Sequence, residues 1–130
     1  MAEPNPTILI ADDETHIVYI LQAKLADAGF EVVVARDGRE ALDLARRHRP
    51  RLLVTDLDMP RMDGMTLCLA LREHPETADL PVIMLTGRGH TVPDGDRART
   101  NIRHLESKPF SARHLLDLVR QHLGDAPAAA

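Results

Sequence analysis

The sequence is poor in the residues that mark disulfide scaffolds, membrane spans or nucleic-acid-binding surfaces. Its single cysteine, Cys68, cannot form an internal disulfide, and none of its apolar runs approaches the length of a membrane span. Only Tyr19, Phe30 and Phe110 are aromatic, and the net charge at pH 7 is −4. The chain therefore offers neither a basic field nor a stacking platform, and we expect it to bind neither nucleic acid nor membrane.

Length and composition favour one globular domain. With 130 residues, the chain is long enough to bury a continuous core and too short for two typical domains. Hydrophobic residues make up 44% of it and charged residues 28%, a balance typical of soluble globular proteins. The first ten residues, MAEPNPTILI, lack the basic start and long apolar stretch of a secretory signal, so we expect a cytoplasmic protein.

Basic residues gather in one stretch, RRHRPR, at residues 46–51. It lies where a helix is expected to end, and cations there complement the helix dipole while staying solvated. We therefore interpret it as a helix end rather than a binding site. The seven histidines show no close spacing typical of metal ligands, and none of them is a candidate ligand.

Short apolar runs alternate with amphipathic segments along the whole chain. The expected strands are residues 7–11, 31–35, 51–55, 81–85 and, with a weaker pattern, 103–107. Their near-continuous Val, Ile and Leu content predicts parallel strands that are covered on both faces. Five strand–helix units imply right-handed crossovers and an α/β fold with a doubly wound, five-stranded parallel sheet.

The segments between the expected strands carry helix signals. The first apolar stripe stops at Gly29 and consists of Ile17, Leu21, Leu25 and Ala28. Asp37 and Glu40 form a capping pair that opens a helix through about residue 48. Further helices are expected over residues 64–74, about 96–101, and from Ser111 as N-cap to about 123. Pro93 and Gly95 favour a short or late fourth helix.

Polar residues that are candidates for binding or catalysis follow four of the five expected strands. They are Asp12, Asp13 and Glu14; Asp56; Thr86 and Gly87; and Lys108 with Pro109. Sheets of this kind bind ligands beyond the carboxyl ends of their strands, so these groups are expected at one rim. Each also has a structural explanation: acids cap helices, Pro60, Asp63 and Gly64 are typical of a capped turn, and a lysine before proline can lie on the surface.

Together, the rim residues form an apparatus for phosphoryl transfer to a carboxylate. Clustered carboxylates repel one another, and Mg²⁺, which prefers oxygen ligands, relieves that repulsion and bridges to a phosphoryl oxygen. One carboxylate is then free to act as the nucleophile. Lys108 and Thr86 would neutralise the remaining phosphoryl oxygens as charge spreads in the transition state, and Gly87 leaves room for the incoming group.

These motifs resemble the receiver domain of two-component response regulators. The resemblance rests on ADDE after the first strand, DLDMPRMDG after the third, LTG after the fourth and SKPF after the fifth. Order and spacing match over residues 7–123. Residues 1–6 would then be an N-terminal extension, and residues 124–130 a C-terminal tail or the start of a linker to an output domain.

The resemblance implies a flavodoxin-like (βα)5 fold with strand order 2-1-3-4-5 and a role for each candidate. Asp56 would accept the phosphoryl group, Thr86 would be the switch hydroxyl, and Lys108 would pair with the phosphate. The implied Mg²⁺ ligands are Asp12, Asp13, Asp56 and the backbone carbonyl of Asp58. Asp63 is expected to be only a turn and cap residue.

The resemblance also implies the partners. The donor would be a phosphohistidine on a sensor histidine kinase or a histidine phosphotransfer protein, which would meet the domain over the rim and the first helix. Phosphorylation would change the face formed by the fourth helix, fifth strand and fifth helix, and so control an output domain or a downstream protein. Such a domain is not an enzyme beyond catalysing its own phosphorylation and dephosphorylation.

The sequence departs from the family pattern at two places. Leu105 stands where an aromatic residue commonly changes rotamer on activation, and Asn101 and Ile102 replace a small Gly-Ala pair. Both changes leave the acidic residues and Lys108 intact. They affect the expected route by which phosphorylation reaches the output face.

Two rival functions share parts of the pattern. A haloacid-dehalogenase-type phosphatase would use Asp56 and Asp58 as its DxD pair, but its acidic metal pair follows that motif, whereas Asp12 and Asp13 precede it here. A flavodoxin-like FMN binder would need a glycine- and hydroxyl-rich phosphate loop after the first strand. The acids at this place would instead repel a phosphate.

Overall fold

The computed structural model describes residues 7–87 and 94–123 of the chain. Its strands are β1 (Thr7–Ala11), β2 (Glu31–Ala35), β3 (Leu52–Asp56), β4 (Val82–Thr86) and β5 (Ile102–Ser107). Its helices are α1 (Thr15–Asp27), α2 (Gly38–His48), α3 (Gly64–Arg72), α4 (Asp94–Ala98) and α5 (Ala112–Leu123). None of the described helices is both long and apolar enough to cross a lipid bilayer.

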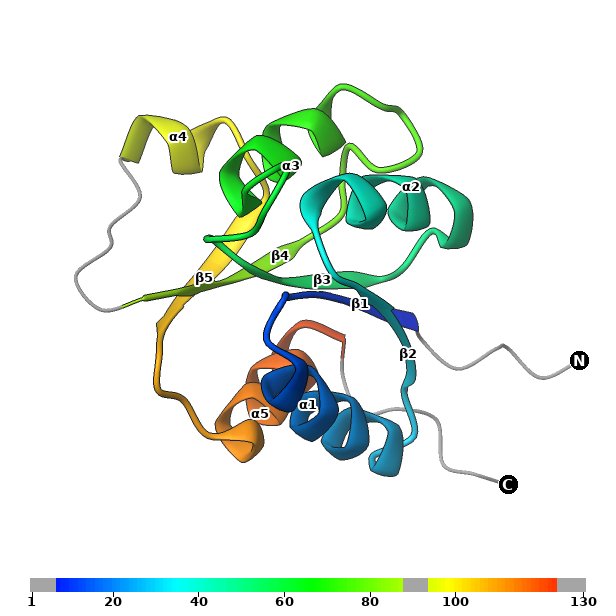
Figure 1. Cartoon of the computed structure of the whole chain (residues 1–130). Helices are drawn as coiled ribbons and strands as arrows, with labels where there is room; N and C mark the ends of the chain where they lie inside the picture. The colour runs from blue at the N-terminus through cyan, green and yellow to red at the C-terminus, as the bar shows by residue number, and fades with distance from the viewer. Residues whose placement is uncertain (1–6, 88–93, 124–130) are drawn as a thin grey trace, which may run out of the picture.

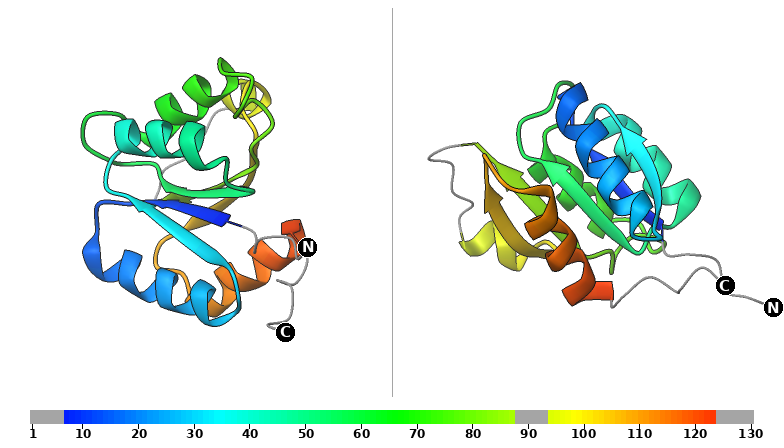
Figure 2. Two further views of the ribbon diagram at one scale, coloured as in Figure 1. Left: turned by 90° about the vertical axis from the view of Figure 1, so that its right-hand side faces the viewer. Right: turned by 90° about the horizontal axis from the view of Figure 1, so that it is seen from below.

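The five strands form one parallel sheet in the order β2-β1-β3-β4-β5. Helices α1 and α5 cover one face of this sheet, and α2, α3 and α4 lie on the other (Figure 1). Two further views show the same three layers (Figure 2). The predicted doubly wound α/β fold and its strand order are therefore confirmed.

Each central strand contributes to two separate hydrophobic clusters because successive side chains point to opposite faces. In β1, Ile8 and Ile10 belong to the cluster under α1 and α5, whereas Leu9 belongs to the one under α2 and α3. All five residues of β3 and all five of β4 are buried. This double burial explains why these strands have continuous apolar sequences instead of alternating ones.

The predicted helix ends are formed by local hydrogen bonds. Asp37 caps α2 by accepting a bond from the Glu40 backbone N–H at 2.8 Å, and Ser111 Oγ accepts one from the His114 N–H at 2.9 Å. Helix α1 ends before Gly29, whose φ of 100° lies in the left-handed region that suits glycine. The basic residues 46–48 form the last turn of α2, as expected.

The structure corrects several predicted boundaries. Strands β3 and β4 lie one residue later than expected, so Asp56 and Thr86 are the last strand residues rather than the first loop residues. The backbone explains the first shift, because the Leu57 N–H donates to the Leu85 carbonyl at 2.8 Å and extends the sheet through Asp56. Strand β5 begins one residue earlier than predicted, at Ile102.

Two helices are also corrected. Helix α3 ends at Arg72 rather than at residue 74, because the Thr77 hydroxyl donates to the Leu71 carbonyl at 2.7 Å and Pro75 disfavours a longer helix. Helix α4 runs over Asp94–Ala98 instead of residues 96–101, and the Thr100 hydroxyl donates to the Arg97 carbonyl beyond its end. The predicted shortness of α4 is confirmed, whereas Pro93 lies outside the described residues.

Candidate functional site

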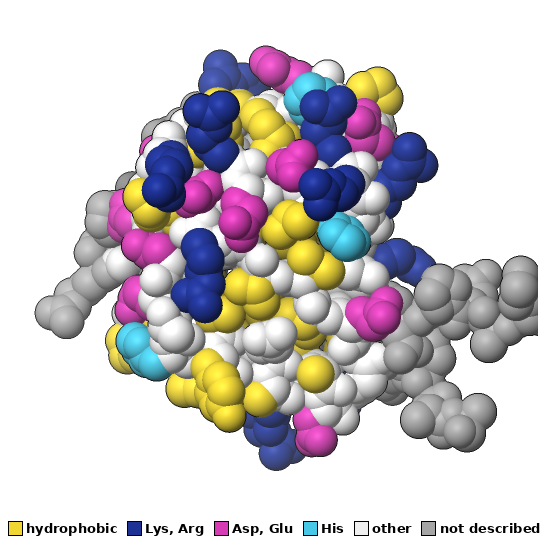
Figure 3. Space-filling view, turned by 45° about the vertical axis from the view of Figure 1, so that its right-hand side comes forward, with side chains coloured by type: hydrophobic (Ala, Val, Ile, Leu, Met, Phe, Trp, Pro, Cys, Tyr) yellow, Lys and Arg dark blue, Asp and Glu magenta, His cyan; other side chains and the backbone are white. Residues whose placement is uncertain are grey.

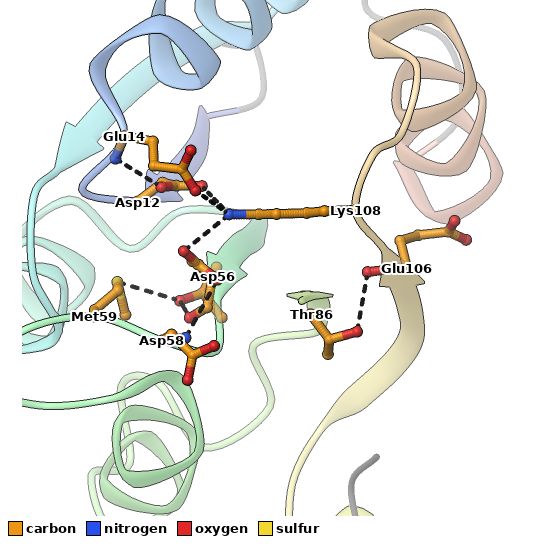
Figure 4. A network of polar contacts seen from close by, with 9 residues as sticks. Asp12, Glu14, Asp56, Asp58, Met59, Thr86, Glu106 and Lys108 are labelled. Atoms are coloured by element: carbon orange, nitrogen blue, oxygen red, sulfur yellow. Dashed lines mark hydrogen bonds and ion pairs between the residues drawn. The ribbon is translucent and has the colours of Figure 1, made fainter. Parts of the chain in front are cut away.

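The carboxyl ends of β1, β3 and β5 bring acids and one lysine together at one rim of the sheet. Lys108 lies in the segment after β5 and extends its side chain across the rim toward Asp12, Glu14 and Asp56 (Figure 4). Its Nζ lies 2.7 Å from Glu14 Oε1, 3.0 Å from Asp56 Oδ2 and 3.6 Å from Asp12 Oδ2. Lys108 is thus in direct contact with Asp56, which lies 52 positions earlier in the sequence, and with Glu14, which lies 94 positions earlier.

Three carboxylates form an acidic pocket that fits a divalent cation. One oxygen each from Asp12, Asp13 and Asp56 lies within 4.8 Å of the others. Asp12 is fully buried; its Oδ1 accepts a bond from the Glu14 N–H at 2.9 Å, while its Oδ2 has no hydrogen-bond partner among the described residues. A buried carboxylate oxygen that lacks a donor is suited to a hard metal ion.

Burial and the lysine act in opposite directions on the protonation of the pocket. Burial raises the pKa of Asp12 to about 6, against the hydrogen bond from the Glu14 backbone. Burial also raises the pKa of Asp56, although Lys108 and the Asp58 N–H partly offset the effect. Burial tends to lower the pKa of Lys108, but its hydrogen bonds to Glu14 and Asp56 outweigh burial and raise it. Lys108 therefore stays charged at neutral pH.

The loop between β3 and α3 is held against the end of β3. The Asp58 N–H donates to Asp56 Oδ1 at 3.2 Å, and the Gly64 N–H donates to the Leu57 carbonyl at 2.8 Å. A Cβ atom on Gly64 would lie 2.4 Å from the Asp56 carbonyl oxygen, so only glycine fits there. Asp63 caps α3 by accepting a bond from the Thr66 N–H, which confirms its predicted cap role.

Thr86 lies near the pocket, but its hydroxyl does not face Asp56. The hydroxyl donates to the Glu106 carbonyl at 3.5 Å and so points toward β5 (Figure 4). The Thr86 carbonyl accepts a bond from the Lys108 N–H at 2.8 Å, which fixes the start of the lysine segment relative to β4. Of the predicted site residues, Asp12, Asp13, Asp56 and Lys108 are thus brought together, and Thr86 adjoins them.

Glu14 was expected at the rim from the sequence, but sequence reasoning gave it no role. Its carboxylate makes the shortest of the three ion pairs that Lys108 forms with described residues, and that hydrogen bond lowers the pKa of Glu14. The available signal was its position directly after Asp12 and Asp13 in the ADDE motif. Nothing in the sequence indicates that a residue 94 positions away completes the pair.

The two unusual positions of β5 lie on the side of α3. Leu105 is half-buried, pairs with Met84 of β4 and packs against the cluster under α2 and α3. Asn101 is buried; its side chain accepts a bond from Arg72 Nη1 at 2.8 Å and donates to the Ala78 carbonyl. Asn101 thus ties the start of β5 to the end of α3.

An apolar groove of about 410 Å³ adjoins the acidic rim. Its lining residues come from α1 and from the segment between β5 and α5: Glu14, His16, Ile17, Ile20, Leu21, Lys108, Pro109, Phe110 and Ala112. Ile20 and its neighbour Tyr19 are large hydrophobic residues that remain exposed. Hydrophobic side chains gather on the α1 side of the molecule, below a belt of charged side chains on the α2 side (Figure 3).

Comparison with known proteins identifies the family. Residues 8–120 match the family described as the response regulator receiver domain. The chain belongs to this family. The match gives no support to a haloacid-dehalogenase-type phosphatase or to an FMN-binding flavodoxin.

Relatives of the receiver domain include longer regulators. It is 38% identical to "Response regulator Rre1" of Synechocystis sp., over all of this chain and 56% of that protein. It is 39% identical to "Probable transcriptional regulator ycf27" of Galdieria sulphuraria, over 87% of this chain and 43% of that one. The chain therefore spans about half the length of the curated relatives it matches.

A solved structure shows the same architecture. The crystal structure of a putative response regulator from Chloroflexus aurantiacus superposes with a TM-score of 0.82 at 35% sequence identity. The similarity covers 93% of this chain and 98% of that one. This chain thus shares its overall fold with that protein.

Proposed function

We propose that this receiver domain is a phosphorylation-activated switch that accepts a phosphoryl group on Asp56 in a Mg²⁺-dependent reaction. The observation that carries the proposal is the surroundings of Asp56: its Oδ2 lies 3.0 Å from the Lys108 ammonium, and its carboxylate shares a pocket with Asp12 and Asp13. A carboxylate held beside a fixed cation and two further acids is suited to act as a phosphoryl acceptor.

The donor in this proposal is a phosphohistidine on a sensor kinase or a phosphotransfer protein. An Asp56 carboxylate oxygen forms the new bond to phosphorus, while the P–N bond breaks and its electron pair stays on the departing imidazole nitrogen. Lys108 neutralises phosphoryl oxygens during the transfer because its ammonium already lies at the Asp56 carboxylate. Asp12, Asp13, Asp56 and the Asp58 carbonyl would hold Mg²⁺, which supplies further positive charge to those oxygens.

Thr86 is the switch residue in this proposal. Its hydroxyl bond to the Glu106 carbonyl is 3.5 Å long, at the weak limit of hydrogen bonding. A phosphoryl oxygen on Asp56 offers a stronger, charged acceptor. Thr86 therefore turns from β5 toward the phosphoryl group. In this proposal the domain catalyses only its own phosphorylation and dephosphorylation.

The apolar groove is the proposed docking place of the donor protein. It is lined by Glu14 and Lys108 at the site and by Ile17 and Ile20 on α1. A donor protein bound in the groove would therefore lie next to the site that contains Asp56. The exposed Tyr19 extends the apolar surface along α1. Tyrosine and aliphatic side chains at the rim of a groove are typical of protein contacts.

The output lies outside the receiver unit in this proposal. We assign residues 7–123 to the receiver domain, residues 1–6 to an extension and residues 124–130 to a tail or the start of a linker. Relatives about twice as long include transcriptional regulators, which supports an output domain or partner controlled through α4, β5 and α5. The reaction takes place in the cytoplasm, where the ATP that charges sensor kinases is found.

Phosphorylation by a small donor tests the assignment of Asp56. With Mg²⁺ and acetyl phosphate, the intact mass of the wild-type chain should rise by one phosphoryl group, and the Asp56→Asn variant should show no gain. Asp63→Asn is the matched control, because it removes a carboxylate from the same loop while asparagine still caps α3. Equal labelling of wild type and Asp56→Asn would disprove the proposal.

A further inference from the structure

Glu14 holds the site lysine without serving as a helix cap. It occupies the N-cap position of α1, yet its side chain forms no cap hydrogen bond with that helix. Its Oε1 instead accepts a hydrogen bond from Lys108 Nζ at 2.7 Å, shorter than the 3.0 Å bond from Nζ to Asp56. The position of the Glu14 carboxylate is therefore explained by its contact with Lys108 and not by helix capping.

Glu14 adds negative charge at the entrance of the pocket. The Asp12 and Asp56 side chains are 0% and 5% exposed, whereas that of Glu14 is 42% exposed and that of Lys108 18%. An anion that approaches from solvent thus meets Glu14 before it meets the buried acids. One ammonium serves Glu14, Asp12 and Asp56 together, so each phosphoryl oxygen must compete for its N–H donors.

We infer that Glu14 is a positioning residue that makes the site selective against free anionic phosphodonors. Its carboxylate occupies one N–H donor of the Lys108 ammonium, and its negative charge repels an incoming anionic phosphate compound that makes no other contacts with the protein. A donor protein overcomes this penalty because it also gains contacts in the apolar groove, of which Glu14 and Lys108 form one end. The inference rests on the proposed function of Asp56 as acceptor and assigns its preferred donor class.

The Glu14→Gln variant tests this inference, because glutamine keeps the size of the side chain and removes its charge. Rates of phosphorylation are measured by intact mass at saturating Mg²⁺, which removes any difference in metal affinity. We expect acetyl phosphate, a dianion, to react roughly tenfold faster with Glu14→Gln than with wild type, with the gain shrinking at high salt. Phosphoramidate, which carries less negative charge, should show a smaller gain.

Two further variants separate charge from structure. Glu76→Gln makes the same change at a carboxylate that pairs with Arg46 on another part of the surface, and it should react like wild type. Glu14→Asp keeps the charge and should also stay close to wild type. A salt-dependent gain in Glu14→Gln alone is a signature that a merely structural role does not produce.

The possible failures are distinguishable. Equal or slower reaction of Glu14→Gln with acetyl phosphate, while wild type is phosphorylated on Asp56, overturns the inference and leaves the proposed function standing. A gain in Glu14→Asp as large as that in Glu14→Gln overturns the role of charge and with it the inference. If neither wild type nor any variant gains a phosphoryl group, both the inference and the proposed function are wrong.

Discussion

At the scale of single residues, the pocket is dominated by carboxylates that are ionised at a cost. Asp12 is fully buried, its Oδ2 has no hydrogen-bond partner in the described chain, and burial raises its pKa to about 6. The groups that face it are Glu14 and Asp56, which repel its charge, and Lys108, which attracts it. The pocket therefore reduces the stability of the metal-free domain near neutral pH, and a bound cation removes that cost.

This cost predicts how stability depends on pH. A carboxyl group with a higher pKa in the folded than in the unfolded chain binds its proton more tightly when folded. The contribution of Asp12 to the free energy of unfolding should thus rise as the pH falls from above 6 toward 4, since its ordinary pKa is 3.8. Asp12→Asn should stabilise the metal-free domain at pH 7 by about 2 kcal/mol.

Denaturant unfolding of wild type and Asp12→Asn at pH 5 and pH 7.5, with and without Mg²⁺, measures this effect. The variant should lose the pH dependence contributed by this group and most of the stabilisation by Mg²⁺. Asp43→Asn removes one exposed acid of α2 and controls for net charge. Lower stability of Asp12→Asn than of wild type at pH 7.5 without Mg²⁺ would show that the buried charge is better compensated than we infer.

At the scale of secondary-structure elements, much of the fold could be predicted because the apolar runs of the strands and the apolar stripes of the helices are both clear. The runs around Leu53 and Ile83 predict buried strands, and the Asp37 and Glu40 pair predicts the start of α2. Predicted ends were wrong by one to three residues, in part because contacts distant in sequence decide some of them. Such a contact is the bond from the Leu57 N–H to the Leu85 carbonyl, which extends β3 through Asp56.

The site was predictable as a set of residues and unpredictable as a geometry. Asp12 and Lys108 follow strands, Asp56 ends one, and parallel strands place their carboxyl ends at one rim. The direction of the Thr86 hydroxyl depends on a rotamer, and the contact of Glu14 with Lys108 depends on the reach of two long side chains. Neither property is encoded in spacing along the chain.

The β3–α3 loop gives a prediction at the element scale. Gly64→Ala should lower the free energy of unfolding by about 2 kcal/mol or more, because the added Cβ would lie 2.4 Å from the Asp56 carbonyl oxygen. Gly95→Ala is the matched control: its Cβ meets nothing within 4 Å, and alanine favours the helix there. Denaturant unfolding measures both, and an unchanged midpoint for Gly64→Ala would mean that the loop relaxes freely.

At the scale of the whole molecule, the rim lies between two surfaces with different tasks in the proposed function. Lys108 borders the apolar groove beside α1, while Thr86 adjoins β5 and thereby the face formed with α4 and α5. In the proposed function the signal from Asp56 passes through Thr86, whose hydroxyl bonds the Glu106 carbonyl of β5. Leu105 directly precedes Glu106 and is held against the core cluster on the α3 side.

Because Leu105 is apolar and half-buried, we predict that the face formed by α4, β5 and α5, the distal face, responds weakly to phosphorylation. When Thr86 turns toward the phosphoryl group, the space it leaves would favour inward burial of a large aromatic ring. Leucine gains less from the same movement and carries no hydroxyl to stabilise an outward position. Phosphorylation should therefore change the loops around Asp56 and Thr86 more than the surroundings of Leu105.

The substitution Leu105→Tyr should enlarge the distal response. Backbone amide shifts are compared before and after addition of beryllofluoride and Mg²⁺, which together mimic the phosphoryl group, with Leu105→Met as an apolar control of similar size. In wild type and Leu105→Met, shifts should be large near Thr86 and small near Leu105; in Leu105→Tyr they should be large at both places. Shifts near Leu105 in wild type as large as those near Thr86 would mean that leucine transmits the signal without an aromatic ring, because the movement of β5 itself would then carry it.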